Sequence, residues 1–295
     1  MEKKCGYIAL AGRPNAGKST FLNAALGEKV SIVSDKPQTT RNRILGVYHD
    51  DTTQIGFFDL PGIHKPKHAM NRVMMRMVHQ GLDDADLVLH FIDVSVPLGS
   101  GDRFVHEFLA KKEVPVLVVA NKMDLVNKAK VIPTLEKIHA DFAPKDLIPI
   151  SAKTGDNRDR VIEVVRNYLP ESDFLFQADT LTDQPLRFMS QEFIREKILH
   201  YTREELPHAA AVTIESFTHH EEEGVYEISA VIYVEKATQR RIVLGKQGQM
   251  IAKIREGARR SLRTLLDQPV HLELYVKVNE NWRNNDAILG DLNIN

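Results

Sequence analysis

The sequence predicts an α/β domain followed by a smaller α+β domain, because its hydrophobic pattern changes along the chain. In residues 1–170, short apolar runs alternate with amphipathic stretches, which is typical of a mixed, mostly parallel six-stranded sheet with helices on both faces. Residues 186–295 instead show a helix, two strands, a second helix and a final strand. Between them, residues 171–185 carry scattered acids and a proline without any period, so we interpret them as a linker.

In the first domain, strands are predicted at short runs of apolar residues, each followed by a polar or glycine-rich stretch. These runs are 7–11, 45–49, 54–58, 87–94, 116–120 and 147–150. Helices are predicted where apolar residues recur every three or four positions. These segments are 18–25, 70–81, 102–111, 131–141 and 157–168.

In the second domain, the clearest element is a strand at 270–278, where apolar and polar residues alternate strictly. A helix is predicted at 188–201, and two strands at 211–217 and 225–235 are joined by the polar turn HHEEEG. Residues 249–266 carry apolar side chains at the spacing of one helix face. Together these elements predict a small α+β module.

The composition is that of an ordinary globular protein, with 43% hydrophobic and 27% charged residues. Cys5 is the only cysteine, which excludes an internal disulfide and suits a reducing cytosol. No apolar run approaches the roughly 20 residues that span a bilayer. None of the 12 histidines stands at metal-ligand spacing with a cysteine, so we expect no zinc site. We therefore expect a cytoplasmic protein without a transmembrane segment.

Residues 12–19, GRPNAGKS, match the phosphate-binding pattern G-x-x-x-x-G-K-[ST] between a predicted strand and a predicted helix. Glycines allow the backbone to wrap around phosphates, and the helix N-terminus supplies positive potential. Lys18 is placed to neutralise phosphate charge and Ser19 to bind Mg²⁺. The pattern in this context predicts a nucleotide site.

Three further motifs, each at the end of a predicted strand, identify the nucleotide. Residues 59–62 (DLPG) place a carboxylate and a glycine N–H beside the terminal phosphate and the metal. Residues 121–124 (NKMD) provide a carboxylate for the N1–H and the amino group of guanine, whereas adenine has no donors in those places. Residues 151–153 (SAK) suit a backbone N–H that reaches the guanine O6. Four motifs in this order predict a GTPase rather than an ATPase.

The GRPNAGKS loop, the sequence PQTTR at 37–41 and DLPGI at 59–63 together resemble the Era-like family of translation-factor-class GTPases. This resemblance implies that Thr40 closes on Mg²⁺ in the GTP state. It also implies that K⁺, held partly by Asn15, stimulates hydrolysis; alternatively, Asn15 only shapes the loop. Ile63 stands where Ras-type enzymes carry a water-orienting glutamine, so we expect slow intrinsic hydrolysis.

A second glycine loop, GKQG at 245–248, lies in a strongly basic segment. Residues 236–263 contain nine basic residues against Glu256 alone, a local net charge of +8 in a chain of net charge −1. This patch favours a polyanion. G-x-x-G on a small α+β module is typical of the KH domain, which clamps single-stranded RNA, although a purely structural turn is the alternative. Residues 234–254 and 280–285 also resemble the KH domain of the Era-like family.

The resemblance implies a GTP-controlled RNA-binding protein that assists small-subunit ribosome assembly. Its type II KH domain would bind the 3′ end of small-subunit ribosomal RNA, and GTP binding would reposition this domain through the 171–185 linker. The alternative is a GTPase that serves RNA modification, although relatives of that kind carry a separate catalytic domain and a C-terminal cysteine motif. We expect a monomer with at most a weak peripheral association with the inner face of the cell membrane, through the basic helix.

The predicted site residues fall into four groups. The residues expected to bind GTP or GDP are Gly12, Arg13, Pro14, Asn15, Ala16, Gly17, Lys18, Ser19, Thr20, Asp59, Leu60, Pro61, Gly62, Asn121, Lys122, Asp124, Ser151, Ala152 and Lys153. Those expected to act in catalysis are Lys18, Thr40, Gly62 and Asn15, and those expected to bind Mg²⁺ are Ser19, Thr40 and Asp59. Those expected to bind RNA are Arg240, Arg241, Gly245, Lys246, Gln247, Gly248, Lys253 and Arg255. Trp282 could stack on a base or pack beneath the C-terminal helix, and we favour packing.

Overall fold

The computed structural model divides into two compact units. It describes the chain except residues 1, 67–68, 203–205, 281 and 293–295. The first unit comprises Met1–Val33, Thr40–Pro66 and Met74–Asp183. The second comprises Ser34–Thr39, Lys67–Val73 and Gln184–Asn295. The first unit thus extends to Asp183 and includes most of the predicted linker.

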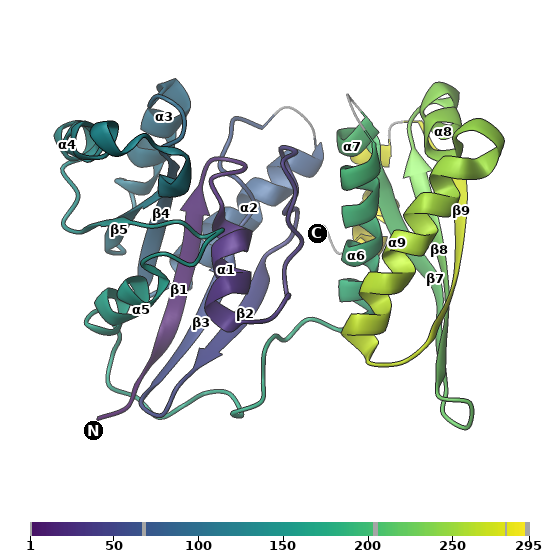
Figure 1. The fold of residues 1–295 in the computed structure, drawn as a ribbon, viewed down its shortest axis with the longest axis horizontal. Helices are drawn as coiled ribbons and strands as arrows, with labels where there is room; N and C mark the ends of the chain where they lie inside the picture. The colour runs from purple at the N-terminus through teal and green to yellow at the C-terminus, as the bar shows by residue number, and fades with distance from the viewer. Residues whose placement is uncertain (1, 67–68, 203–205, 281, 293–295) are drawn as a thin grey trace. The chain divides into compact units, whose positions relative to one another are not determined.

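The first unit is built on a six-stranded sheet in the order β2-β3-β1-β4-β5-β6 (Figure 1). Its strands are β1 (Lys4–Gly12), β2 (Ile44–His49), β3 (Thr53–Asp59), β4 (Leu87–Asp93), β5 (Val116–Asn121) and β6 (Leu147–Pro149). Only β2 pairs antiparallel with its neighbour, and all the other pairs are parallel. This is the predicted mixed, mostly parallel sheet.

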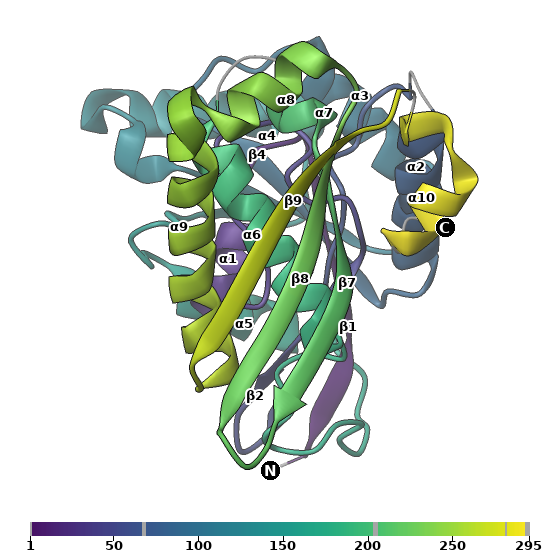
Figure 2. The same ribbon diagram turned by 90° about the vertical axis from the view of Figure 1, so that its right-hand side faces the viewer.

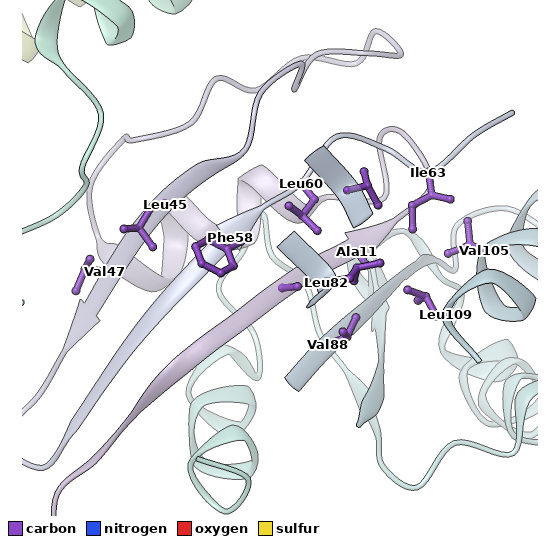
Figure 3. Packing of buried hydrophobic residues seen from close by; sticks show 12 residues of the cluster. Ala11, Leu45, Val47, Phe58, Leu60, Ile63, Leu82, Val88, Val105 and Leu109 are labelled. Atoms are coloured by element: carbon purple, nitrogen blue, oxygen red, sulfur yellow. The ribbon is translucent and has the colours of Figure 1, made fainter. Parts of the chain in front are cut away.

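Helices cover both faces of this sheet. They are α1 (Lys18–Leu26), α2 (Ala69–Asp83), α3 (Ser100–Leu109), α4 (Val131–Phe142) and α5 (Arg158–Arg166). On one face, side chains of α2 and α3 pack onto β1, β3 and β4 in a core that includes Ala11, Phe58, Val88 and Val105 (Figure 3). Helices α1 and α5 contact each other. Because parallel strands carry their following loops at one edge of the sheet, the four sequence motifs converge there.

Residues 171–182 form a strap that contacts the edge of this sheet. Gln54 of β3 holds the strap, since its Oε1 accepts hydrogen bonds from Leu175 N (2.7 Å) and Phe176 N (2.9 Å). Its Nε2 donates to Phe176 O at 2.9 Å. Further along, Val47 N of β2 donates to Leu181 O at 2.9 Å. The segment interpreted as a linker is therefore hydrogen-bonded to β2 and β3 at several of its residues.

The second unit has a three-stranded sheet in the order β7-β8-β9, with helices on one face (Figure 2). Its elements are α6 (Leu186–Tyr201), α7 (Leu206–Ala209), β7 (Ala211–His220), β8 (Val225–Val234), α8 (Ala237–Leu244), α9 (Gln249–Leu266), β9 (Val270–Val278) and α10 (Asp286–Asp291). Strand β8 pairs antiparallel with β7 and parallel with β9. Helices α6 and α9 pack closely, since a Cβ on Gly257 would lie 2.8 Å from the Tyr201 hydroxyl oxygen.

Helix α8 was not among the predicted elements. Its sequence, ATQRRIVL, buries only Val243, so it has no apolar period that distinguishes a helix from a loop. The helix is short because Gly245, with φ 72°, ends it. Helix α8, the GKQG loop and α9 together form a helix–turn–helix, which completes the predicted α+β module.

Candidate functional site

The GRPNAGKS loop adopts a backbone conformation that depends on its glycines. Gly17 has φ 96°, and a Cβ there would lie 2.0 Å from Asn121 Nδ2, so only glycine fits. Asn15 also has a positive φ of 63°, which asparagine tolerates better than most residues. Helix α1 begins at Lys18, directly after Gly17. The loop therefore presents backbone N–H groups and a helix N-terminus at one place, as an anion site requires.

Lys18 lies buried within this loop and is directed back onto it. Its Nζ donates to Arg13 O at 3.2 Å. Burial lowers the pKa of Lys18, and the nearby charge of Asp59 partly offsets that effect. A cation removed from water in this way gains much from an incoming phosphate. The side chain of Arg13, another predicted ligand, points elsewhere and forms a 2.9 Å ion pair with Asp102 at the start of α3.

The three residues predicted to bind Mg²⁺ lie together, although they come from separate parts of the sequence. Ser19 Oγ donates to Asp59 Oδ2 at 2.5 Å and lies 3.0 Å from Thr40 Oγ1. Ser31, which sequence reasoning missed, also donates to Asp59 Oδ2, at 2.7 Å. Asp59 Oδ1 is buried and has no hydrogen-bond partner among the described residues.

This arrangement of hard oxygen atoms fits Mg²⁺. An unpartnered buried carboxylate oxygen is costly, and a divalent cation would satisfy it. Burial raises the pKa of Asp59, whereas Lys18 and the hydroxyls of Ser19 and Ser31 act to lower it. Ser19, Thr40 and Asp59 are therefore the residues that would hold the ion, with Ser31 orienting the carboxylate.

The predicted guanine-binding motifs converge on Asn121, which is buried at the end of β5. Its Nδ2 donates to Ala16 O at 2.8 Å, and its Oδ1 accepts from Ala152 N at 2.9 Å. The Asn121 side chain thus forms hydrogen bonds with both the phosphate loop and the SAK segment. Ser151 Oγ donates to Asp124 Oδ1 at 2.7 Å, while the carboxylate of Asp124 lies at the exposed surface. Asp124 is therefore oriented and accessible to a base.

Lys122 occupies a strained position between these residues. Its φ is 72°, and its Nζ forms a 2.5 Å ion pair with Asp93 at the end of β4. Asp93 was not predicted as a site residue because it stands alone after an apolar strand, without a motif around it. The ion pair fixes the lysine beside the loop that the sequence assigned to guanine.

The DLPGI segment lies against the phosphate loop. Ile63 N donates to Gly12 O at 3.0 Å, and a Cβ on Gly62 would lie 2.6 Å from Pro14 N. The side chain of Ile63 is buried in the hydrophobic core with Leu60 (Figure 3). Close approach therefore requires glycine at position 62, and residue 63 offers no polar group to a water.

The GKQG loop turns sharply between α8 and α9. Gly245, Gln247 and Gly248 all have positive φ, and a Cβ on Gly245 would lie 2.6 Å from Met250 Cβ. Nothing lies within 4 Å of the Cβ position of Gly248, so the outer side of the loop is open. Lys246 and Gln247 are exposed there, and α9 begins at Gln249. This open loop at a helix N-terminus suits a phosphate backbone.

The basic residues predicted around this loop differ in their surroundings. Arg241, Lys246 and Arg255 are exposed and have no ion-pair partner among the described residues. Arg240 Nε donates to Val276 O at 3.2 Å, and Lys253 Nζ lies 4.6 Å from the centre of the Tyr201 ring. Trp282 is buried, with its Nε1 donating to Ala209 O, so it packs within the module and offers no face to a base.

Comparison with known proteins identifies both units. The family model described as a 50S ribosome-binding GTPase matches residues 7–122, and the KH domain model matches residues 205–283. The chain is similar to Era in a crystal structure with MgGDPNP and nucleotides 1506–1542 of 16S ribosomal RNA, at 38% identity and TM-score 0.95. It is equally similar to a point variant of Aquifex aeolicus Era bound to GDP and AlF4⁻, at 38% identity and TM-score 0.94. Each comparison covers 99% of both chains.

Proposed function

Because this chain belongs to the Era family of GTPases, we propose that it is a Mg²⁺-dependent, GTP-hydrolysing switch that binds the 3′ end of small-subunit ribosomal RNA and assists assembly of that subunit. The similarity to Era covers 99% of both chains, which supports this proposal over a GTPase that serves RNA modification. The observation that carries the proposal is the convergence of Ser19, Thr40 and Asp59, with the buried Oδ1 of Asp59 unsatisfied.

The nucleotide would be held by three groups of residues. Lys18, which now donates to Arg13 O, would donate to the β- and γ-phosphates, and the backbone N–H groups of the loop would surround them. Bound Mg²⁺ supplies positive charge to the phosphate oxygens. Asp124, oriented by Ser151, would accept from the N1–H and amino group of guanine. An adenine would leave that carboxylate unpaired, which gives the base preference its physical basis.

Hydrolysis requires positive charge near the γ-phosphate and an oriented water. The chain places groups for the charge beside the phosphate loop, but residue 63 offers none for the water. Ile63 is buried and cannot orient a water. The Gly62 N–H and the Lys18 ammonium stand beside the phosphate loop and would stabilise charge on the γ-phosphate. We propose that K⁺, bound partly by Asn15, adds the positive charge that an arginine finger adds elsewhere. An unchanged hydrolysis rate on replacing K⁺ with Na⁺ would contradict this.

RNA binding is assigned to the open side of the GKQG loop. Its backbone N–H groups and the exposed Lys246 would contact the phosphates of a single strand, with Arg241 and Arg255 on the flanking helices. We propose that Arg240 and Lys253 act mainly by their charge, since both side chains have contacts within the module. GTP would favour the RNA-binding arrangement, and hydrolysis would release the RNA.

We also propose that the chain acts as a monomer in the cytoplasm. None of the described helices is long and apolar enough to cross a membrane. The surplus of basic residues between 236 and 263 supports, in addition, weak peripheral contact with the inner face of the membrane.

A matched pair of variants tests the RNA site. Gly248 has φ 78° and open space around its Cβ position, and both Asp and Asn tolerate such a conformation. Gly248→Asp is expected to weaken binding of a 3′ ribosomal RNA fragment by tenfold or more, because it places a negative charge against phosphate. Gly248→Asn, which has the same shape without the charge, should retain most of the affinity. Equal losses in both variants would refute an electrostatic contact at this loop.

A second measurement tests the switch. The affinity of the full chain for the same RNA is compared in the presence of GDPNP and of GDP. Equal affinities would contradict the coupling, whereas an absence of RNA binding in both states would contradict the RNA site itself.

A further inference from the structure

The first unit has an open apolar groove whose lining includes none of the residues assigned to the nucleotide. Its volume is about 510 Å³, which lies in the range of ligand-binding pockets. One wall is the loop between β4 and α3, residues 94–98, and the other is the segment from Leu125 through the first turns of α4. We call it the α4 groove. Ile138 of α4 is fully buried there.

The lining of the α4 groove is unusually apolar for a surface. Val96 is 50% exposed and Leu125 is 62% exposed, and both line the groove with Pro97, Leu98 and Pro133. Single exposed apolar residues are common, but a contiguous set that lines a depression is a candidate binding surface. Covering these side chains would remove apolar area from water, which favours association.

The polar rim of the groove carries positive charge. Lys130 and Lys137 line it, and neither has an ion-pair partner among the described residues. Two carboxylates near the groove are already engaged, since Asp93 pairs with Lys122 and Asp141 with Arg103. A binding partner with carboxylates beside its apolar side chains would therefore complement both the apolar lining of the groove and the lysines at its rim.

The chemistry of the lining favours a protein segment over RNA. Many single-strand sites carry aromatic side chains on which bases stack, and no Phe, Tyr or Trp is among the described residues that line this groove. Two lysines at a mainly aliphatic groove also contrast with the basic surplus around the GKQG loop. An amphipathic helix or strand with aliphatic anchors fits better.

We propose that the α4 groove docks an acidic, amphipathic segment of a protein of the small ribosomal subunit. Aliphatic side chains of that segment cover Val96 and Leu125, and its carboxylates pair with Lys130 and Lys137. The proposal rests on the function proposed above, because that function brings the chain to the subunit. The first unit then contacts ribosomal protein while the KH module contacts ribosomal RNA.

Photo-crosslinking on the full chain tests this directly. The crosslinking amino acid p-benzoylphenylalanine is placed at Val96 in the groove, at Ile132 as a control, and at Lys246 in the RNA loop. Ile132 is a suitable control because it lies on α4 and is 68% exposed, but it does not line the groove. Each protein is incubated with GDPNP and purified small ribosomal subunits and then irradiated.

The expected result is a crosslink from position 96 to a subunit protein, within a peptide that carries aliphatic residues beside Asp or Glu, and none from position 132. A crosslink from position 96 to RNA, or none from 96 while 246 crosslinks to RNA, overturns the docking proposal and leaves the proposed function intact. If position 246 does not crosslink either, the proposed function fails, and the docking proposal fails with it.

Binding of the subunits provides an independent measurement. Val96→Asp is expected to weaken the affinity of the full chain for small subunits about tenfold, the usual effect of losing one buried anchor. Lys130→Glu with Lys137→Glu should do the same and should make the remaining binding less dependent on salt. Ile132→Asp should have no effect. Equal affinities for Val96→Asp and Ile132→Asp would overturn the proposal.

Discussion

Replacing Gln54 with alanine is expected to release the strap from the sheet. Gln54 is fully buried, and its amide satisfies Leu175 N, Phe176 N and Phe176 O at 2.7–2.9 Å. Alanine offers none of these bonds. Each is worth about 1 kcal/mol to stability, so the strap should be destabilised locally by about 2–3 kcal/mol, less whatever water restores to the freed groups.

Hydrogen exchange measures this directly at the affected amides. A local loss of about 2–3 kcal/mol corresponds to roughly 30- to 150-fold faster exchange at Leu175 and Phe176. Val47 N–H, which bonds to Leu181 O on the same strap, should also exchange faster. Gln177→Ala is the matched control, because it makes the same chemical change at an exposed strap residue. Exchange within threefold of the wild type in Gln54→Ala would refute this account of the strap.

The same variant has a functional readout. If the strap transmits the state of β2 and β3 to the second unit, Gln54→Ala should reduce the ratio of RNA affinities measured with GDPNP and GDP. Affinity for GTP itself should change little, because Gln54 lies outside the phosphate loop and the base-binding motifs. If the strap is released in Gln54→Ala but the ratio of RNA affinities with GDPNP and GDP stays at its wild-type value, the coupling does not pass through the strap.

Three further predictions concern the nucleotide site and the core. Asp124→Asn should lower affinity for GTP by tenfold or more and improve binding of xanthosine triphosphate, because the amide N–H₂ can donate to the xanthine O2. Nucleotide titrations would measure both affinities, and a retained preference for GTP would contradict the assignment of Asp124 to the base. Ser31→Ala removes the 2.7 Å bond to Asp59 Oδ2 and should weaken Mg²⁺-dependent nucleotide binding about tenfold, as measured by Mg²⁺ titration of fluorescent GDP. Burial holds the pKa of His90 at about 3, so the unfolded state takes up a proton below pH 6.5 and the native state does not. The free energy of unfolding should therefore fall by about 1.4 kcal/mol per pH unit from this group between pH 6 and pH 4, and His90→Phe should remove that part of the slope in denaturant titrations.

Much of the site could be predicted because its residues come from short motifs at strand ends. GRPNAGKS, DLPG, NKMD and SAK each follow a strand, and parallel strands bring their ends to one edge of a sheet. Ser31 and Asp93 could not be predicted in the same way. They contact Asp59 and Lys122 through loop geometry, and nothing in the neighbouring sequence distinguishes them from other polar residues.

In the second unit, sequence patterns predicted the elements that bury one face and did not predict helix α8. The alternation in β9 and the apolar spacing in α9 predicted those elements, because each buries one face. Helix α8 has too few buried residues to show a period, and it is specified by its packing against α9 and β9. Charge indicated the region that we propose to bind RNA, but the side-chain contacts of Arg240 and Lys253 depend on the tertiary structure.

The strap also limits how far one part of the chain can reach from the other. With its hydrogen bonds made as far as Thr182, whose Oγ1 donates to Leu45 O, only residues 183–185 precede α6. Three extended residues span about 10 Å, and Pro185 stiffens the last of them. Release of residues 171–182 would lengthen this tether to about 50 Å. Docking of the strap to β2 and β3 thus sets the length of chain left before α6, and its release would increase that length about fivefold.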